Sequence, residues 1–533
     1  MPAPLCLVGL PAAGKTTVGR HLAAALGRRF VDLDAAIADA VGEPAAALVA
    51  RDEPRFRRVE AAALAEALAA TDGPVIATGG GAAAHGDNVE RMRAAGLVVE
   101  LAVSLAELRR RAVDGPARPL LDDDRAAFAE RARARAPWYR RAHAVVATDG
   151  RRLDEVVAAV AEVHAVWAAL PSARARDGYV MGLPGRAHPV LVADAAPPAD
   201  ELAAHLDGRT PALMIDGNVA AAWPDLPTTL GLAAAPRVIV PPGEASKSFA
   251  GFGVACEQLV AAGVDRGGVI VAVGGGVTGD LAGLVAATLL RGLPVVHLPT
   301  TVVAMTDSAI GGKTAIDLPA GKNLVGAFWQ PRLVWASLEV LASLPPAERQ
   351  AGFGELWKYA LLDGEATWAA VEAVAGWATA PAGAPPPPAF AEVVRRAVAQ
   401  KGGVVVRDER ETGDDRILLN LGHTVGHAME AEAGLAHGVA VALGLVAACQ
   451  VAAALGHAPA ELTQRVVDAL ATTGLPHDPR PYLTPGALAR LGADKKRRGT
   501  HVRFVMPFAV GRCAPVELAV DDLATILRAT AAP

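Results

Sequence analysis

Residues 9–16 read Gly-Leu-Pro-Ala-Ala-Gly-Lys-Thr, the pattern G-x-x-x-x-G-K-[ST]. This octapeptide constrains the fold more than any other stretch, because it follows an apolar run, Leu5–Val8, and precedes a helical pattern over residues 14–26. Glycines let backbone N–H groups close around phosphate oxygens, Lys15 neutralises the β- and γ-phosphates, and Thr16 can hold Mg²⁺. The pattern predicts a strand–loop–helix unit of a parallel α/β sheet, with a nucleotide bound at the loop.

Apolar runs and helical patterns alternate through this first part of the chain, which is typical of a parallel sheet with crossover helices. We expect strands at residues 5–8, 75–77 and 97–103. A long helical pattern over residues 153–170 then ends the alternation, and we expect a domain boundary near residues 171–178.

The rest of the chain begins with a second α/β alternation and then becomes mainly helical. Strand candidates occur at residues 212–215, 237–240, 269–273 and 295–298. From about residue 340 onwards helical patterns dominate, which predicts a nucleotide-binding α/β domain followed by a mainly helical one. The proline-rich residues 379–388 are either a linker or a surface loop of the helical domain, and the helical patterns on both sides favour the loop.

Bulk properties exclude several classes of protein. The chain is 20% charged with a net charge of −5, which argues against a polybasic nucleic-acid binder. Residues 438–456 are uncharged and long enough to span a membrane, but they consist mostly of Ala, Gly and Val, which favours a buried core helix. Four separated cysteines and an N-terminus without a basic–apolar leader indicate a cytoplasmic protein with no membrane or nucleic-acid partner.

Further short motifs follow the phosphate loop in order. They are residues 30–34 (Phe-Val-Asp-Leu-Asp), 56–60 (Phe-Arg-Arg-Val-Glu), 77–81 (Ala-Thr-Gly-Gly-Gly), 118–121 (Arg-Pro-Leu-Leu) and 135–139 (Arg-Ala-Pro-Trp-Tyr). We expect Asp32 and Asp34 to lie on one face of a strand. Each motif alone has an ordinary explanation as a cap, a turn or a solvated cation. Together they resemble shikimate kinase over residues 1–168.

The resemblance implies a kinase domain of the P-loop NTPase type that phosphorylates shikimate with ATP and Mg²⁺. Nucleotide and Mg²⁺ would be held by Gly14, Lys15, Thr16, Thr17, Asp32 and Arg118, the last on a lid. Shikimate would be held by Asp34, Arg57, Gly79, Gly80 and Arg135. Lys15 and Asp34 are the catalytic candidates, and Asp34 can orient the acceptor hydroxyl or act as base. The alternatives are another small-molecule kinase or a non-catalytic nucleotide-binding module.

A second glycine-rich loop, residues 274–280 (Gly-Gly-Gly-Val-Thr-Gly-Asp), follows the strand candidate 269–273 and precedes a helical pattern over residues 281–290. This context predicts a pyrophosphate site at a helix N-terminus. No acidic residue stands about twenty positions further on, where an ordinary Rossmann dehydrogenase has one. A plain dehydrogenase is therefore not the best interpretation.

Metal-ligand residue types occur further along the chain. His423 and His427 are four residues apart, which places them on one helix face, and His437 and Glu355 add two more candidate ligands. The alternative is that the first two histidines are hydrogen-bonded core residues. Of the 51 basic residues only 8 are lysines, and seven of these lie beside the glycine-rich loop or the histidines. Compact ammonium groups there indicate an anionic, phosphorylated substrate.

Nine ordered motifs make residues 172–533 similar to 3-dehydroquinate synthase. They occupy residues 242–247, 274–280, 299–301, 307–314, 321–331, 355–358, 420–427, 437–438 and 494–496. The resemblance implies that NAD oxidises the sugar phosphate DAHP transiently, that phosphate is eliminated, and that the hydride returns, so 3-dehydroquinate forms without net redox change. The alternatives are another sugar-phosphate cyclase or a metal-dependent polyol dehydrogenase.

The resemblance also implies roles for individual residues. Glu355, His423 and His437 would bind Zn²⁺ or Co²⁺. NAD would contact Asp216, Asn218, Glu244, Lys247, Gly276, Val277, Thr278, Gly279, Asp280, Thr300, Thr301, Lys313 and Lys322. DAHP would contact Asp307, Lys313, Asn323, Lys358, Lys401, Arg416, Asn420, His427 and Lys495 or Lys496. Lys313, Lys358 and His427 are the catalytic candidates.

The sequence therefore predicts a bifunctional enzyme of the shikimate pathway, which leads to chorismate and the aromatic amino acids. Its expected domains are a kinase domain (residues 1–168), a Rossmann-like α/β NAD domain (172–340) and a mainly helical metal and substrate domain (341–533). The expected partners are small molecules, with homodimerisation through the synthase part as a further expectation.

Overall fold

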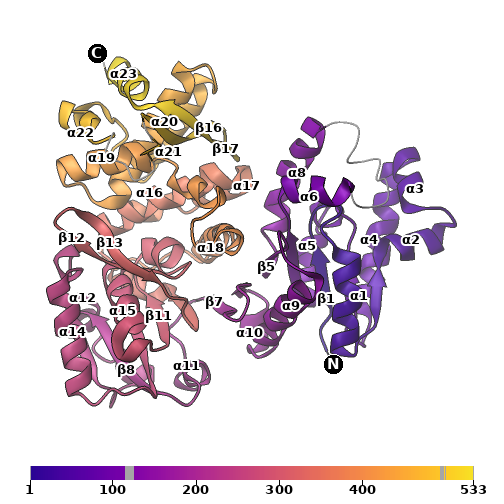
Figure 1. The fold of residues 1–533 in the computed structure, drawn as a ribbon, viewed down its shortest axis with the longest axis horizontal. Coiled ribbons are helices and arrows are strands. Elements are labelled where there is room, and N and C mark those ends of the chain that lie inside the picture. Colours follow the sequence, from indigo (N-terminus) through magenta and orange to yellow (C-terminus); the bar gives the residue numbers. More distant parts are fainter. Residues whose placement is uncertain (1, 114–124, 492–496, 499, 532–533) are drawn as a thin grey trace. The chain divides into compact units, whose positions relative to one another are not determined.

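The computed structural model describes residues 2–113, 125–491, 497–498 and 500–531. The chain forms two compact units (Figure 1). The first comprises residues 1–191 with 405–407, and the second comprises residues 192–404 with 408–533. The first unit extends past residues 171–178, because strand β6 (Tyr179–Met181) pairs with strand β5 (Ala144–Ala147) and β7 (His188–Ala193) pairs with β6.

The first unit is built on a parallel sheet with the strand order β2-β3-β1-β4-β5. The strands are β1 (Leu5–Val8), β2 (Phe30–Asp32), β3 (Val75–Ala77), β4 (Leu97–Ala102) and β5 (Ala144–Ala147). The helices are α1 (Lys15–Leu26), α2 (Leu33–Val41), α3 (Ala45–Arg51), α4 (Glu53–Ala69), α5 (Asn88–Ala95), α6 (Leu105–Val113), α8 (Arg125–Tyr139), α9 (Leu153–Ala168) and α10 (Ser172–Ala175). Leu5 and Leu7 pack in one core cluster and Cys6 and Val8 in another, so the central strand is buried on both faces.

The second unit contains five parallel strands in the order β14-β11-β10-β8-β9. Its strands are β8 (Thr210–Asp216), β9 (Arg237–Val240), β10 (Gly268–Gly274), β11 (Val295–Pro299) and β14 (Leu333–Ser337). Its helices are α11 (Ala199–Leu206), α12 (Gly217–Ala222), α13 (Leu226–Thr229), α14 (Phe249–Ala261) and α15 (Gly276–Thr288). The four strands predicted between residues 212 and 298 all lie within observed strands.

An antiparallel hairpin packs on α15, and the sequence patterns did not predict it. It consists of β12 (Lys313–Leu318) and β13 (Gly321–Phe328). Gly283 of α15 faces Thr314 so closely that a Cβ atom would collide with the threonine side chain. The hairpin carries two of the motif lysines, Lys313 and Lys322.

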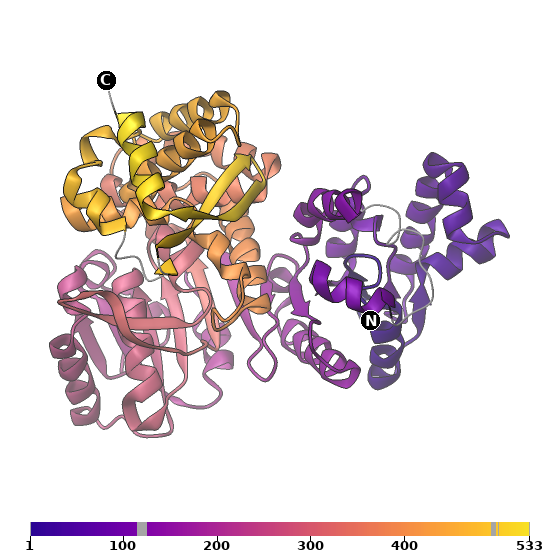
Figure 2. The same ribbon diagram turned by 45° about the horizontal axis from the view of Figure 1, so that its top comes forward.

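The remainder of the second unit is mainly helical, as predicted. Its helices are α16 (Pro346–Asp363), α17 (Glu365–Glu372), α18 (Phe390–Arg407), α19 (His423–Ala433), α20 (His437–Ala454), α21 (Ala460–Thr472), α22 (Pro485–Arg490) and α23 (Val520–Ala531). An antiparallel sheet of β15 (Arg497–Arg498), β16 (His501–Ala509) and β17 (Arg512–Ala519) was not predicted. It packs against α20 and α23, near the C-terminal end of the chain (Figure 2).

Helix α20 explains the uncharged stretch of the sequence. It is long and apolar enough to cross a membrane, yet 72% of its span is buried inside the protein. It packs against α16, α19 and α21. The prediction of a core helix is confirmed.

The proline-rich run is a surface loop between a 3₁₀ turn (Ala375–Thr379) and α18. The Trp377 indole donates a hydrogen bond to the Ala384 carbonyl at 3.1 Å, and the buried Arg349 guanidinium donates to the carbonyls of Ala380 and Pro381. These bonds hold the loop on the helical part, so it is not a linker between domains.

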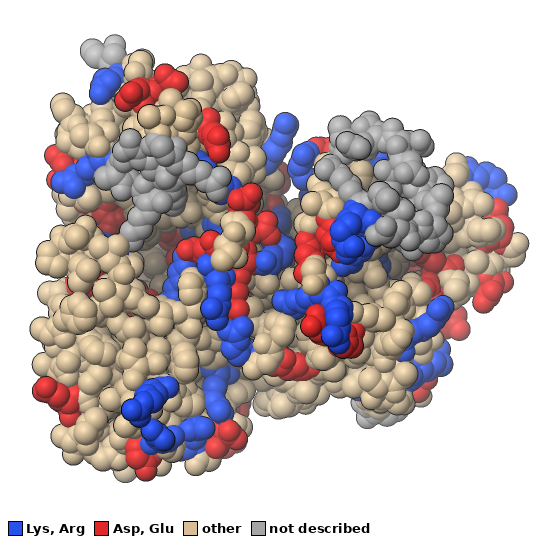
Figure 3. Space-filling view, in the orientation of Figure 1, with Lys and Arg blue, Asp and Glu red and all other residues tan. Residues whose placement is uncertain are grey.

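Charged side chains of both signs lie on one face of the molecule, which Figure 3 shows. On the face drawn in Figure 3, Lys and Arg lie among Asp and Glu, and the described residues form no extended basic patch there.

Two glycines set the distance between α16 and α20. A Cβ atom on Gly438 would collide with the carbonyl oxygen of Ala351, and one on Gly354 would collide with the carbonyl oxygen of Gly438. The two helix backbones are therefore in direct contact. Because Glu355 follows one glycine and His437 precedes the other, this contact brings two candidate metal ligands together.

We expect Gly438→Ala to destabilise the second unit by about 3 kcal/mol or more, because the added methyl group meets backbone rather than a movable side chain. Gly253→Ala in α14 is the matched control, since no atom lies within 4 Å of a Cβ there. Urea unfolding followed by tryptophan fluorescence measures the difference, because six of the eight tryptophans lie in the second unit. Equal midpoints for the two variants would show that the close helix contact is dispensable.

Candidate active sites

The phosphate loop connects β1 to α1, as predicted. Gly14 caps α1 with φ 94°, and Gly9 has φ 138°, both in the region that favours glycine. The buried Lys15 ammonium donates to the carbonyl oxygens of Gly9 and Leu10, each at 2.9 Å, and so lies along the loop. Backbone N–H groups and the positive end of α1 meet at this point. The geometry is that of an anion site for phosphate groups.

Asp32 and Thr16 form the candidate Mg²⁺ ligands. The Thr16 hydroxyl donates to Asp32 at 2.7 Å. The prediction that Asp32 and Asp34 share a strand face is wrong, because β2 ends at Asp32 and Asp34 lies in the first turn of α2. The Asp32 carboxylate caps that helix by accepting from the backbone N–H of Asp34 at 3.1 Å. The oxygen donors present suit Mg²⁺.

The candidate acceptor site lies beside the glycine run at residues 79–81. A Cβ atom on Gly79 would lie 3.1 Å from the Asp34 carboxylate and 2.8 Å from that of Glu60, and one on Gly81 would lie 2.6 Å from the Arg57 guanidinium. The glycines are therefore not an ordinary turn. They leave room for three charged side chains.

The charged side chains of this acceptor site form ion pairs with one another. Arg57 pairs with the buried Glu60 at 2.6 Å and with Glu53 at 3.0 Å. Burial raises the pKa of Glu60, and Arg57 partly offsets this effect. Desolvation and the neighbouring Asp32 raise the pKa of Asp34, although its side chain remains accessible. A carboxylate with a raised pKa suits proton exchange with a hydroxyl group.

Arg135 on α8 also reaches this site. It interacts with the Tyr139 hydroxyl, which donates to the Gly80 carbonyl at 2.5 Å. The structure thus brings Asp34, Arg57, Gly79, Gly80 and Arg135 to one region. Arg118 lies outside the described residues.

The dinucleotide candidates gather where the parallel strands of the second unit end. Asp216 ends β8, Gly274 ends β10, and Thr300 and Thr301 follow β11. Helix α15 begins at Gly276, five residues before the predicted start, with Gly275 as its cap. A Cβ atom on Gly275 would lie 3.0 Å from Thr301, so the loop has no room for side chains there. This is the expected place for a pyrophosphate in an open α/β sheet.

Asp216 also shapes the backbone beside the loop. Its carboxylate caps α12 by accepting from the Asn218 backbone N–H at 2.8 Å. Both residues, which the resemblance assigns to NAD binding, therefore lie at the carboxyl end of β8.

Lys247 contacts several polar side chains among the residues that the resemblance assigns to NAD, which we call the cofactor side of the site. Its buried ammonium donates to Asp280 at 2.7 Å and to Asn323 at 2.6 Å, and the Glu244 and Asp317 carboxylates lie at 4.0 Å. Burial raises the pKa of Asp280 to about 6, against the opposing effect of Lys247. Asn323 was assigned to the substrate, but in this structure its amide oxygen faces the cofactor-side lysine.

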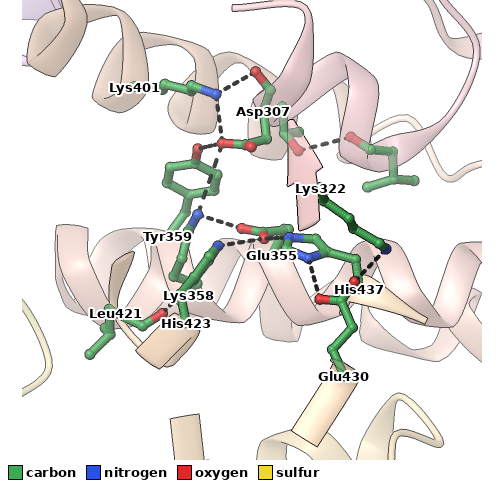
Figure 4. Close-up of polar contacts among 12 residues, drawn as sticks. Asp307, Lys322, Glu355, Lys358, Tyr359, Lys401, Leu421, His423, Glu430 and His437 are labelled. Atoms are coloured by element: carbon green, nitrogen blue, oxygen red, sulfur yellow. Dashed lines mark hydrogen bonds and ion pairs between the residues drawn. The ribbon is translucent and has the colours of Figure 1, made fainter. Parts of the chain in front are cut away.

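The metal candidates converge from three helices (Figure 4). Glu355 of α16 is fully buried, and its Oε1 lies 3.1 Å from His437 Nε2 and 3.5 Å from His423 Nε2. His427 joins them, because ligand atoms of His423, His427 and His437 lie within 4.8 Å of one another. The described residues of this cluster offer two imidazole nitrogens and a carboxylate, with a third imidazole beside them. That donor set suits Zn²⁺ or Co²⁺.

The protonation of this cluster depends on its surroundings. Burial, then the Lys358 charge, holds the pKa of His423 well below its usual value. Its Nδ1 faces the Leu421 carbonyl at 3.0 Å, so Nε2 is left for a ligand role. Burial opposes charge on His437, but hydrogen bonds to Glu355 and Glu430 outweigh it and raise the pKa of His437 to about 10. Cation binding to His437 requires loss of that proton.

A group of ammoniums and carboxylates adjoins the cluster. Lys358 lies 2.5 Å from Glu355 and 3.9 Å from Asp307, and Lys401 lies 2.7 Å from Asp307. The Tyr359 hydroxyl donates to Asp307 at 2.6 Å. Burial works against the charge on Lys358, but the two carboxylates outweigh it and raise its pKa, whereas burial dominates for Lys401 and lowers its pKa.

The remaining substrate candidates lie on the loop before α19 and on the hairpin. Lys313 pairs with the Glu411 carboxylate, and Arg416 lies 3.9 Å from the same carboxylate and donates to the Gly311 carbonyl at 3.2 Å. Asn420 ends the 3₁₀ turn (Asp415–Asn420) that precedes α19. Lys495 and Lys496 lie outside the described residues.

The sequence interpretation missed Glu60, Tyr359, Glu411 and Glu430 as site residues. Tyr359 directly follows Lys358. Glu430 stands seven residues after His423, two helical turns along the same face, so helical spacing could have identified it. Glu60 stands three residues after Arg57 on α4, so helical spacing could have identified it as well, whereas Glu411 had no such signal.

Comparisons with known proteins agree with this division. The shikimate kinase family model matches residues 11–165, and the N-terminal and C-terminal models of 3-dehydroquinate synthase match residues 237–351 and 352–497. The 3-dehydroquinate synthase of Pelobacter propionicus is 43% identical over 293 residues, which are 54% of this chain and 80% of that protein. That of Lactiplantibacillus plantarum is 42% identical over 322 residues, 60% of this chain and 88% of the relative.

Two solved structures share the synthase fold. A 2-deoxy-scyllo-inosose synthase complexed with carbaglucose-6-phosphate, NAD⁺ and Co²⁺ is 25% identical, with a TM-score of 0.58, and the match covers 66% of this chain and 99% of that one. The 2-epi-5-epi-valiolone synthase of Streptomyces hygroscopicus, with NAD⁺ and Zn²⁺ bound, is 25% identical, with a TM-score of 0.55, and covers 64% and 96%.

A phosphate-loop kinase unit followed by a dinucleotide-and-metal unit defines a two-part metabolic enzyme. The chain belongs to the 3-dehydroquinate synthase family and carries a shikimate kinase of the P-loop type at its N-terminal end. It is a bifunctional enzyme of the shikimate pathway. It phosphorylates shikimate with ATP and converts DAHP to 3-dehydroquinate, so the fold class and both predicted activities are confirmed.

Proposed function

We propose that Glu355, His423 and His437 hold Zn²⁺ or Co²⁺ and that this cluster, with NAD at the Gly276 loop, carries the DAHP reaction. One observation carries the proposal: a single buried carboxylate oxygen faces the Nε2 atoms of both histidines, at 3.1 and 3.5 Å. Two structurally similar synthases hold NAD⁺ together with Co²⁺ or Zn²⁺. When bound, NAD supplies reversible hydride transfer, and the cation polarises a substrate hydroxyl.

The chain itself supplies the charges that bind DAHP. Lys358 and Lys401 flank Asp307, and Lys313 and Arg416 lie beside Glu411; these four cations bind the carboxylate and phosphate of the substrate. The set is completed by Asn323, Asn420, His427 and Lys495 or Lys496. Asp307 orients Lys401 and Tyr359 through hydrogen bonds. His427, the accessible imidazole of the cluster, is placed to move a proton.

The cofactor side is assigned to the residues at the strand ends. Asp216, Asn218, Glu244, Lys247, the loop of residues 276–280, Thr300, Thr301, Lys313 and Lys322 contact NAD. The mixed charges around Lys247 suit a ligand that carries both a pyrophosphate and a nicotinamide cation.

In the kinase unit, Gly14, Lys15, Thr16 and Thr17 hold the phosphates, with Asp32 on Mg²⁺ and Arg118 on the nucleotide. Asp34, Arg57, Gly79, Gly80 and Arg135 hold shikimate. Asp34 orients the acceptor hydroxyl and takes its proton, a role that its raised pKa supports.

The proposal also covers the domain bounds, the oligomeric state and the cellular location of the enzyme. The functional domains span residues 1–168, 172–340 and 341–533, the synthase part forms a homodimer, and the enzyme works in the cytoplasm. Because phosphorylation of shikimate does not directly follow formation of 3-dehydroquinate, co-expression explains the fusion without transfer of an intermediate between sites.

Two assays on the full chain test the proposal: phosphate release from DAHP, and ADP formation with shikimate in excess Mg²⁺. A transition-metal chelator should abolish the first activity, added Zn²⁺ or Co²⁺ should restore it, and the second should persist throughout. Phosphate release that survives complete metal removal would refute the metal assignment. Accumulation of NADH with a polyol would instead favour the dehydrogenase alternative.

A further inference from the structure

Glu430 lies at the centre of a hydrogen-bonded chain that crosses the synthase site (Figure 4). Its carboxylate is buried, and both of its oxygens are engaged. Oε2 faces His437 Nδ1 at 3.2 Å, and Oε1 accepts from the Lys322 ammonium at 2.6 Å. A buried carboxylate with a charged partner on each oxygen is held in one orientation.

His437 is less restrained by packing than His423, the other candidate histidine ligand, so a hydrogen-bond partner has a larger effect on its orientation. The His437 side chain is 35% exposed, whereas that of His423 is 9% exposed. His423 is packed, and its Nδ1 faces a backbone carbonyl. With about a third of its side chain exposed, His437 is fixed on the Nδ1 side of its ring by the hydrogen bond to Glu430. When Nδ1–H donates to Glu430, Nε2 is left facing Glu355 at 3.1 Å.

Lys322 reaches Glu430 from the cofactor side of the site. It lies on hairpin strand β13, while Glu430 lies on α19 of the helical part. Its second acidic neighbour, Glu244, is further away at 3.9 Å. The main ion pair of this lysine is therefore the one that restrains Glu430.

We propose that Glu430 is a positioning residue that orients His437 for cation binding, and that Lys322 holds Glu430 in place. Affinity for the metal then depends on a lysine of the cofactor side, even when no NAD is bound. The inference rests on the proposed metal cluster and adds to it a residue that touches neither metal nor substrate.

The test is Co²⁺ binding to the full chain without NAD or DAHP, measured by equilibrium dialysis and by the visible absorption of bound Co²⁺. Glu430→Ala should weaken binding about 10- to 100-fold, the usual effect of removing a residue that orients a metal-bound histidine. Glu430→Gln should weaken it less, because its amide oxygen still accepts from Nδ1–H. Lys322→Met should weaken it about twofold to fivefold, as expected for loss of one partly exposed ion pair.

The matched control is Glu432→Gln, which removes a carboxylate of the same helix that pairs with Arg490 at 3.0 Å outside the cluster. It should bind Co²⁺ like the unaltered chain. Equal affinity for Glu430→Ala, Glu430→Gln and this control would overturn the positioning role, and unchanged affinity in Lys322→Met would overturn the role of the lysine. If Glu430→Ala does not fold, the nearly isosteric Gln variant decides. An unaltered chain that binds no Co²⁺ would refute the metal cluster itself, which is a separate failure.

Discussion

His423→Ala should reduce phosphate release from DAHP to the level of the metal-free protein, while ADP formation with shikimate stays unchanged. The imidazole is buried and its Nε2 faces Glu355 at 3.5 Å, whereas the neighbouring imidazole, His427, is exposed and is assigned to the substrate. Loss of one of three protein ligands leaves a divalent cation weakly held. Coupled assays for the two products, together with metal content after dialysis, measure the effect.

The control for this variant is His477→Ala. His477 Nδ1 also faces a carbonyl two residues earlier, that of Leu475 at 3.2 Å, but the ring is exposed and lies outside the cluster. Both activities should survive its removal. Loss of both activities in His423→Ala would mean that the two enzymes depend on each other, and retained metal with full phosphate release would remove His423 from the ligand set.

Lys15→Ala should have the opposite effect. We expect kcat/KM for shikimate phosphorylation to fall by about 10²- to 10³-fold, the usual cost of removing one preorganised group from a charged transition state. Lys15 is buried along the loop by hydrogen bonds to Gly9 and Leu10, so its ammonium is already positioned for phosphate. Phosphate release from DAHP should be unaffected. Steady-state kinetics with varied ATP and shikimate measure the change.

His21→Ala is the comparison for Lys15, because it removes an exposed side chain of the same helix whose Nδ1 faces the Thr17 carbonyl at 2.9 Å. Its kinase activity should match that of the unaltered chain. Full activity in Lys15→Ala would show that the loop does not bind the transferred phosphate. In that case the non-catalytic interpretation of the first unit would be favoured.

Local sequence patterns predicted the parts of the fold that depend on residues close together in the chain. The start of α1 and the bounds of β3 follow from apolar runs and from glycines at a tight turn, which act within a few residues. The start of α15 was predicted five residues too late, because its first turn consists largely of glycine and small residues and shows no apolar face. Asp34 was placed on a strand because nothing in the spacing revealed that Asp32 caps a helix.

The hairpin and the small sheet escaped prediction for a different reason. Strands β12 and β13 pair with each other and pack on α15, and β16 and β17 pack on α20 and α23, so their burial is set by distant elements. Strands β13 and β17 are exposed or half-buried along their length and carry little apolar alternation. Glu430 was missed as well, because its role depends on His437 and Lys322, which approach it from other elements.

The sequence by itself determined the chemistry that is available: a phosphate loop, a glycine-rich helix start, imidazoles, a carboxylate, and lysines kept where compact ammonium groups meet anions. Only the tertiary structure decided which of these groups meet. Glu355, His423 and His437 come from three helices, and two of these helices touch because Gly354 and Gly438 have no side chains. Residue type follows from the sequence, whereas distances of 3 to 4 Å between such groups follow from backbone packing that no local pattern encodes.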